Sequence, residues 1–219
     1  MKYRNHGVMA KGSLVHRVPT QEKAVAFTFD DGPHPVFTEQ VLEIFQKING
    51  RATFCMIGQE IDKFGDIAAK VHAAGHEMVN HTYSHPDLTQ LTVEEARAEI
   101  LLGDERIRRV TGKPASNFRP PFFAVNEAIL SLAAEFGYHS IGCVNGEAKD
   151  WEQPQPGADF IVEHTRPTVA NGSILLFHDG YGDRAQTIKA VQVLVQELAA
   201  EGYRFVTVNE LLALAEYHE

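Results

Sequence analysis

The sequence has few cysteines, a single tryptophan, no long apolar run and no excess of positive charge. Its two cysteines, Cys55 and Cys143, lie in separate apolar segments and lack the spacing of a zinc-binding pair. They do not indicate whether the protein works in a reducing or an oxidising compartment. No apolar run reaches the roughly 20 residues that a bilayer-spanning helix needs. A formal net charge of −9 without a basic stripe argues against a nucleic-acid partner.

What remains is ordinary globular composition. The 219 residues are 44% hydrophobic and 22% charged, which is enough chain for one large α/β domain with a real core. Residues 1–6 are basic, but no apolar segment follows them, so we expect no signal peptide in this sequence. The protein is then either cytoplasmic or a secreted form whose signal is absent or removed. We expect residues 1–23 to be an N-terminal extension packed on a domain of residues 24–219.

Strand and helix patterns alternate from Val25 to the end of the chain. Strands are predicted at 24–29, 52–57, 77–80, 116–118, 140–144, 173–177 and 203–208. Helices, with apolar residues three and four apart, are predicted at 36–48, 61–74, 92–110, 127–136, 185–200 and 209–217. Thr92 and Glu95 form a capping-box pattern, and Asn126 is a candidate N-cap. Because no linker interrupts the alternation, we expect one domain on a parallel sheet of about seven strands.

Unusual polar residues follow the ends of five predicted strands. These residues are Asp30 with Asp31, His81, Arg119, Asp150 and His178. The strand ends of a parallel barrel converge on one face, whereas an open sheet brings together only the loops near its switch point. The pattern therefore favours a distorted (β/α) barrel.

An apolar strand ends in two adjacent carboxylates, Asp30 and Asp31, followed by a Gly-Pro turn. Adjacent carboxylates repel each other, and a bound cation would offset that repulsion. An ordinary surface turn is the alternative that this segment leaves open. His81 and His85 add two imidazoles whose spacing suits one metal ion if they share a helical turn. Two histidines with one carboxylate leave positions open for water and substrate, as in catalytic zinc sites.

Three further positions offer chemistry. Arg119 precedes two prolines and can hold a nearby carboxylate ionised, although a structural salt bridge is the alternative. Asp150 precedes the only tryptophan, Trp151, which is either a sugar-stacking surface or a core residue. His178 ends an apolar strand and is either a satisfied core histidine or a general acid whose pKa a carboxylate raises.

Together, five segments resemble, in order, the motifs of the polysaccharide deacetylase family, the NodB-homology domain of carbohydrate esterase family four. They are Thr28-Phe29-Asp30-Asp31-Gly32, His81-x-x-x-His85, Arg119-Pro120-Pro121-Phe122, Asp150-Trp151 and Leu176-x-His178. The resemblance covers the chain from about Val25 to Leu212. It implies a distorted (β/α) barrel and a divalent metal, expected to be Zn²⁺ with Co²⁺, Mn²⁺ or Ni²⁺ as alternatives. It also implies removal of acetyl groups from N-acetylated or O-acetylated sugars.

The resemblance implies a role for each matched residue. The roles are Asp30 as catalytic base, Asp31, His81 and His85 as metal ligands, Arg119 as the residue that orients the base, His178 as general acid, Asp150 as the carboxylate that tunes it, and Phe122, Trp151 and Leu176 as substrate-binding residues. The chain departs from the family at Phe122, where tyrosine is usual, and at Glu147, where aspartate is usual. In the family, the backbone N–H of the residue at position 122 helps to bind the oxyanion. We therefore expect the enzyme to tolerate phenylalanine there, which lacks the tyrosine hydroxyl. The role of Glu147 stays open.

We therefore expect an enzyme that hydrolyses N-acetyl groups of N-acetylglucosamine-containing glycans, such as peptidoglycan or chitin oligosaccharides, and releases acetate. The alternatives are an O-deacetylase acting on acetylxylan and a hydrolase of a non-sugar C–N bond. An inactive binding module would lack a ligand, the base or the acid, and none is missing. The expected partner is an acetylated carbohydrate, and the resemblance suggests an extracellular or cell-wall location. Oligomeric state is not readable from the sequence.

Overall fold

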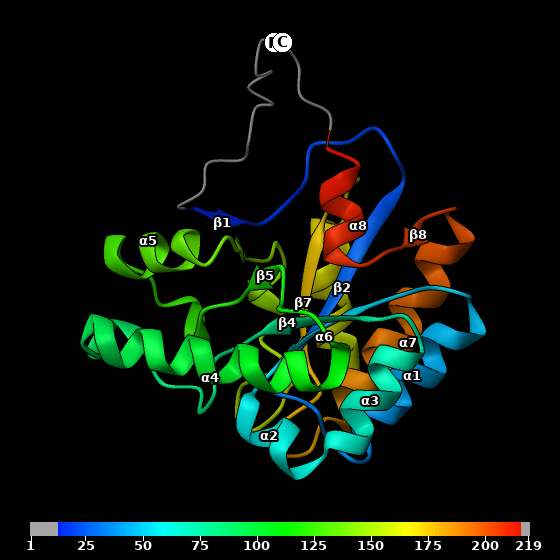
Figure 1. The fold of residues 1–219 in the computed structure, drawn as a ribbon. Helices are drawn as coiled ribbons and strands as arrows, with labels where there is room; N and C mark the ends of the chain where they lie inside the picture. The colour runs from blue at the N-terminus through cyan, green and yellow to red at the C-terminus, as the bar shows by residue number, and fades with distance from the viewer. Residues whose placement is uncertain (1–12, 216–219) are drawn as a thin grey trace.

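A single curled sheet, with helices around it, forms the fold of the computed structural model, which describes residues 13–215 (Figure 1). The strand order is β1-β6-β5-β4-β3-β2-β7, β8 also pairs with β2, and every pairing between these strands is parallel. The strands are β1 (Leu14–Val15), β2 (Ala24–Asp30), β3 (Thr53–Met56), β4 (Glu77–Asn80), β5 (Asn117–Phe118), β6 (His139–Ile141), β7 (Ile174–His178) and β8 (Arg204–Phe205). The predicted distorted barrel of parallel strands is confirmed.

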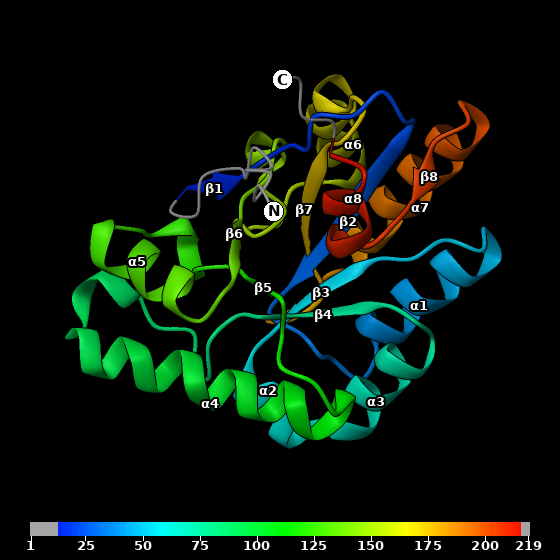
Figure 2. The same cartoon turned by 45° about the horizontal axis from the view of Figure 1, so that its top comes forward.

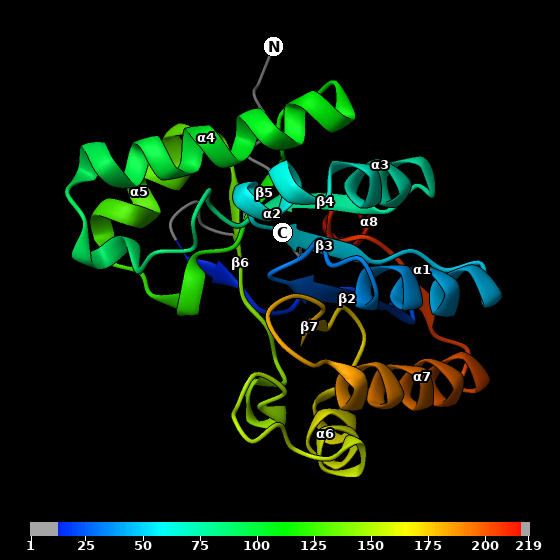
Figure 3. The ribbon, with the colours of Figure 1, turned by 90° about the horizontal axis from the view of Figure 1, so that it is seen from below.

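The helices connect successive strands and cover the outside of the sheet, except for the last one, which follows the last strand and packs on the inner face. They are α1 (Phe37–Lys47), α2 (Gly58–Lys63), α3 (Gly65–Ala73), α4 (Val93–Thr111), α5 (Glu127–Glu135), α6 (Ala158–Thr165), α7 (Ala185–Ala200) and α8 (Val208–Ala213), with short 3₁₀ turns η1 (Leu88–Gln90), η2 (Pro121–Phe123), η3 (Gly146–Ala148) and η4 (Arg166–Thr168). In the view of Figure 2, α8 lies against β2. From below, α3, α1 and α7 form a row along one side (Figure 3). Within the described residues, no helix has the length and apolar character needed to cross a membrane.

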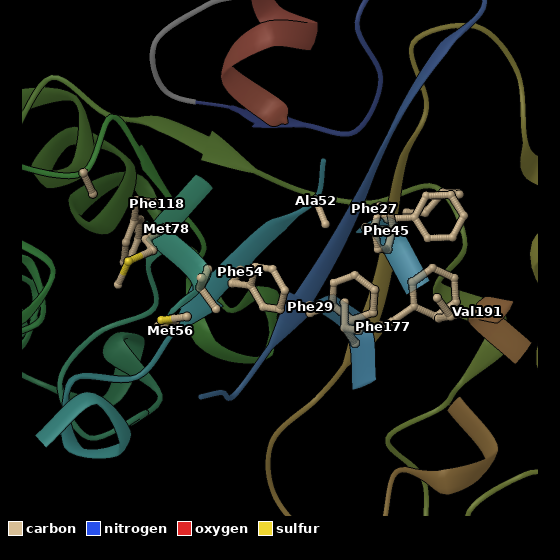
Figure 4. Close-up of a cluster of buried hydrophobic side chains, with 14 of the residues drawn as sticks. Phe27, Phe29, Phe45, Ala52, Phe54, Met56, Met78, Phe118, Phe177 and Val191 are labelled. Atoms are coloured by element: carbon tan, nitrogen blue, oxygen red, sulfur yellow. The ribbon is translucent and has the colours of Figure 1, made fainter. Parts of the chain in front are cut away.

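Successive side chains of β2 point alternately to a core outside the sheet and to the inner face of the barrel. Phe27 and Phe29 point to the outer side, because successive strand side chains face opposite ways. The Phe27 ring lies 5.7 Å from Phe45 of α1 and 5.3 Å from Phe177 of β7. Phe29 stacks on Phe54 at 5.5 Å (Figure 4). This aromatic layer fixes α1 on the sheet.

The inner face of β2 has small residues at one end and polar residues at the other. Ala24 and Ala26 belong to a buried cluster with Val208 and Leu211 of α8. Asp30, four residues beyond Ala26, is on the same face at the carboxyl end of the strand. The two ends of the barrel interior therefore differ, with apolar packing of α8 at one and buried charge at the other.

The seam of the barrel between β6 and β7 is closed partly by a side chain. The backbone N–H of Val144 donates to the Ile174 carbonyl at 3.0 Å. Asn145 is 1% exposed, and its amide donates to the Leu176 carbonyl at 2.9 Å and accepts from the Leu176 N–H at 2.7 Å. One side-chain amide thus makes both hydrogen bonds that a neighbouring strand residue would make.

Some predicted element boundaries are wrong. The single helix predicted at 61–74 is two helices, α2 and α3, because the backbone of Phe64 leaves the helical region with φ −128° and ψ 46°. The strand predicted at 140–144 ends at Ile141, β8 has only two residues, and β1 and α6 were not predicted. The helix predicted at 209–217 begins at Val208 and ends at Ala213, and residues 216–219 lie outside the described part.

The division into an extension of residues 1–23 and a domain of residues 24–219 stays a prediction. Residues 1–12 lie outside the described part. Within the rest of that segment, Leu14 and Val15 pair with β6.

Candidate active site

The two adjacent carboxylates occupy different positions at the end of β2. Asp30 is the last strand residue, and its partner in the β2–β7 register is His178. Asp31 leaves the strand with a left-handed backbone, φ 72°. Both side chains are nearly buried, 3% and 6% exposed. This kink turns the two carboxylates in different directions, although both lie within 4 Å of His81 Nε2.

The histidine segment that follows β4 is not helical. Thr82 and His85 both have left-handed backbones, with φ 68° and 63°. The helical turn on which the His81/His85 spacing was based is therefore wrong, and hydrogen bonds to the loop explain the difference. The Glu99 carboxylate of α4 accepts from the backbone N–H groups of Tyr83 and Ser84 and from the Ser84 hydroxyl, at 2.8–3.1 Å. The Glu99 side chain thereby fixes the loop to α4.

Asp31, His81 and His85 converge on one point, as their predicted role requires. Asp31 Oδ1 lies 3.6 Å from His81 Nε2 and 3.3 Å from His85 Nε2. Among the described residues, these are the only His, Cys, Asp or Glu residues grouped so that at least three could hold one metal ion, and their ligand atoms lie within 4.8 Å of one another. Asp31 Oδ1 is buried without a hydrogen-bond partner. A divalent cation fits this donor set, because it would satisfy that oxygen together with two imidazole nitrogens.

The protonation states also suit a cation. Burial opposes the charge on Asp31, but the neighbouring histidines, His81 first, hold the pKa of Asp31 at about 2. Burial and the neighbouring His81 lower the pKa of His85 to about 4. His81 Nδ1 lies 2.7 Å from the Arg119 carbonyl oxygen, to which it donates when Nε2 is the free nitrogen. Metal ligands must be deprotonated in this way.

Asp30 forms a buried ion pair with Arg119. Arg119 Nη1 donates to Asp30 Oδ1 at 2.6 Å, and the arginine is fully buried. The guanidinium also donates to Thr28 Oγ1 at 2.7 Å and to the Gly142 carbonyl at 2.9 Å. Asp30 Oδ2 is left 3.7 Å from His81 Nε2. One oxygen of Asp30 is therefore fixed by arginine while the other faces His81.

His178, which lies beside Asp30 in the β2–β7 register, is paired with Asp150. Its Nδ1 lies 2.8 Å from Asp150 Oδ1, and Asp150 Oδ2 accepts from the His178 backbone N–H at 2.8 Å. The Thr187 hydroxyl donates to the same Oδ2 at 3.1 Å. Burial disfavours the imidazolium, but the carboxylate of Asp150 outweighs it and raises the pKa of His178 to about 9. His178 is protonated at neutral pH and can give up a proton.

These groups share one pocket of about 530 Å³. It is lined by Asp30, Asp31, His81, His85, Pro120, Phe122, Phe123, Trp151, Leu176, His178, Tyr181 and Arg184. Arg119 and Asp150 are not among the lining residues and act on Asp30 and His178 from behind. Glu147 is exposed on η3 and does not line the pocket.

Sequence reasoning missed several residues that build the site. Asn145, Thr187, Arg184, Glu99 and Tyr181 were not predicted to contribute. Arg184 is 3% exposed and donates to the carbonyls of Gly180 and Asp150, at 2.7 and 2.9 Å. The only signal for it in the sequence is an arginine in the Gly-rich turn that follows His178.

Comparisons with known proteins agree on one family. A family model described as polysaccharide deacetylase matches residues 17–141. A peptidoglycan-N-acetylglucosamine deacetylase of Bacillus cereus is 38% identical, over 92% of this chain and 93% of its own length. A solved peptidoglycan N-acetylglucosamine deacetylase has a TM-score of 0.84 at 30% identity, covering 92% of this chain and 94% of that one. A solved family 4 acetyl xylan esterase from Clostridium thermocellum, in complex with a cobalt ion, has a TM-score of 0.80 at 30% identity, covering 87% and 91%.

Proposed function

The chain belongs to the polysaccharide deacetylase family, and from this premise we propose that it is a metal-dependent hydrolase of N-acetyl groups on N-acetylglucosamine-containing glycans. The observation that carries the proposal is the convergence of Asp31, His81 and His85 in the pocket that also holds Asp30 and His178. Relatives named for peptidoglycan support that glycan as a substrate, and with it a location at the cell wall or outside the cell.

Asp31, His81 and His85 would hold the divalent ion, for which we expect Zn²⁺, with Co²⁺, Mn²⁺ or Ni²⁺ as alternatives. When bound, such an ion polarises a carbonyl and lowers the pKa of water. The unpartnered Asp31 Oδ1 and the two imidazole nitrogens support this assignment. The cobalt ion of the related acetyl xylan esterase supports a divalent metal in the family.

Asp30 is the proposed general base. Its Oδ1 is held by Arg119, so Oδ2 is the oxygen that accepts the proton of the attacking water. The water oxygen then bonds to the acetyl carbonyl carbon. We assign the backbone N–H of Phe122 to the oxyanion that forms, as the resemblance implies.

His178 is the proposed general acid. Held protonated by Asp150, it gives its proton to the leaving nitrogen as the C–N bond breaks. The products are acetate and the free amine of the sugar. Trp151 and Leu176 line the pocket and would receive the acetyl methyl group.

The test is a metal-dependent screen for acetate release. Chitin oligosaccharides, peptidoglycan and acetylxylan are assayed with native, chelator-treated and zinc-reloaded protein. We expect release from at least one N-acetylated glycan, lost on chelation and restored by zinc. No metal-dependent release from any N-acetylated glycan would contradict the proposal.

Release from acetylxylan alone would support the second candidate, an O-deacetylase. The similarity to the solved acetyl xylan esterase favours keeping that candidate. Release from none of the three would leave a C–N hydrolase of a non-sugar substrate as the remaining alternative.

A further inference from the structure

Exposed aromatic side chains gather at the active-site pocket. Four phenylalanine, tyrosine or tryptophan side chains are among the exposed large hydrophobic residues described, namely Phe122, Trp151, Phe160 and Tyr181. Three of them, all except Phe160, line the pocket. Phe122 and Trp151 belong to the family motifs, whereas Tyr181 belongs to none. Apolar surface left exposed around a pocket marks a place where a ligand covers it.

The backbone of Tyr181 is unusual for a bulky residue. Its φ is 51°, in the left-handed region, and Phe122 has φ 57°. Such conformations are outliers for large side chains and cluster at functional sites. The two rings also share a neighbour, because the ring centroids of Phe122 and Tyr181 lie 4.7 and 6.0 Å from that of His85.

The loop that carries Tyr181 is fastened to the catalytic elements. The backbone N–H groups of Asp179 and Gly180 both donate to the Asp30 carbonyl, at 3.1 and 3.2 Å. A Cβ at position 180 would lie 2.0 Å from the Asp31 carbonyl oxygen, so only glycine allows this approach. Arg184, almost fully buried, holds the Gly180 carbonyl from the other side. Tyr181 is therefore presented at a fixed place beside the pocket.

We propose that Tyr181 is a specificity-determining residue that binds the sugar rather than the acetyl group. Its exposed ring offers a flat apolar surface to the C–H face of a pyranose ring of the glycan, at the mouth of the pocket beside His85. This inference rests on the proposed function, because it takes the substrate to be a glycan. Aromatic rings bury large apolar area at little entropic cost, which suits such contacts.

The test compares Tyr181→Gly and Tyr181→Phe with the parent protein. Glycine removes the ring and tolerates the left-handed backbone, so the fold is kept. We expect Tyr181→Gly to raise KM for a chitin oligosaccharide roughly 3–10-fold, as for loss of one aromatic contact, with kcat within about twofold. Tyr181→Phe keeps the ring and restores the parent KM. The matched control is Phe160→Ala, an exposed aromatic on α6 outside the pocket, which leaves KM unchanged.

Two further measurements separate the explanations. An acetyl ester without a sugar, p-nitrophenyl acetate, should show the same KM in Tyr181→Gly and in the parent, and zinc content should be equal. An unchanged oligosaccharide KM, an equal rise for the ester, or a loss of zinc would each overturn the inference.

Calorimetric binding of the oligosaccharide to the parent and to Tyr181→Gly distinguishes this inference from the proposed function. If the parent releases no acetate from any glycan, the proposed function fails. In that case, a lower binding affinity in Tyr181→Gly than in the parent still supports Tyr181 as a sugar contact. An equal affinity in both proteins overturns the inference.

Discussion

Asp30 and Asp31 are adjacent in sequence, yet their carboxylates point to different partners. Asp30 ends the strand on its inner face and pairs with Arg119, whereas the left-handed backbone of Asp31 turns its carboxylate to the two histidines. The pattern of two acids at a strand end indicated a cation. It did not reveal which oxygen faces which partner, because that depends on a single φ angle.

The pairing of His178 with Asp150 leads to a pH-dependent prediction. Asp150→Asn removes the charge that raises the pKa of His178, so the alkaline limb of kcat should move to lower pH by about 1–3 units. The measurement is the pH profile of kcat for both proteins. Thr187→Val, which removes only a hydrogen bond to Asp150, is the control with little shift. An alkaline limb that stays in place in Asp150→Asn would show that another group supplies the proton.

The same pair also contributes to stability, with a definite sign. The pKa of His178 is raised on folding, from 6.5 to about 9. Its contribution is therefore fully present below pH 6.5 and lost as the pH rises through about 9. Denaturant unfolding of the parent between pH 6.5 and 9 should show this loss, and Asp150→Asn should show much less of it.

The buried Arg119–Asp30 pair predicts a non-additive pattern. Arg119→Met leaves a nearly buried carboxylate without its partner and should lower the free energy of unfolding by about 3–5 kcal/mol. Adding Asp30→Asn removes the stranded charge and should recover part of that loss, while both variants lose deacetylase activity. Urea denaturation measures both. A double variant less stable than Arg119→Met would contradict the pairing as described.

At the scale of elements, α4 positions the loop that carries His81 and His85, the proposed metal ligands. Its start was predicted correctly, since Thr92 and Glu95 form the capping box. Its contact with the loop was not predicted, because Glu99 acts on residues 83 and 84 through backbone hydrogen bonds that leave no periodic pattern. For the same reason the left-handed backbones of Thr82 and His85 were not foreseen.

Gly103 of α4 gives a test of this contact. Alanine in a helix interior is normally favoured over glycine by about 1 kcal/mol. Here a Cβ would lie 2.4 Å from Asn80 Oδ1 and 2.9 Å from the Thr82 carbonyl oxygen. Gly103→Ala should therefore destabilise the protein by about 1–3 kcal/mol and weaken zinc binding.

The matched control for Gly103→Ala is Gly65→Ala, at the start of α3. A Cβ there would meet no atom within 4 Å, so we expect no loss of stability or of zinc affinity. Thermal unfolding and zinc titration measure both variants. If Gly103→Ala stabilised the protein as in an ordinary helix, the close packing of α4 on the ligand loop would be refuted.

At the scale of the whole molecule, one end of the barrel interior is filled by the apolar packing of α8, and the other end holds the pocket. Polar residues after five strands predicted convergence on one face, and the structure brings Asp30, His81 and His178 into one pocket. The family resemblance from the five motifs is confirmed as well. The seam was not predictable, because Asn145 replaces a strand residue through its side chain. The packing of α8 at the amino ends of the strands was not predictable either, because no sequence motif marks it.

Leu211 of α8 tests this separation. It is fully buried against the inner face of the sheet at the end opposite the pocket. Leu211→Ala should lower the free energy of unfolding by about 2–5 kcal/mol, while kcat/KM of the folded protein stays within about twofold. Val193→Ala, an exposed residue of α7, is the stability control. A large fall in kcat/KM at temperatures where Leu211→Ala is folded would mean that the two ends are coupled.

Anomalous diffraction at the zinc edge, from crystals of the zinc-loaded protein, tests the assembly of the metal site most directly. We expect one ion with Asp31 Oδ1, His81 Nε2 and His85 Nε2 all at about 2.0–2.2 Å. Zinc bound to other residues, or His81 and His85 on separate ions, would contradict the site and the chemistry built on it.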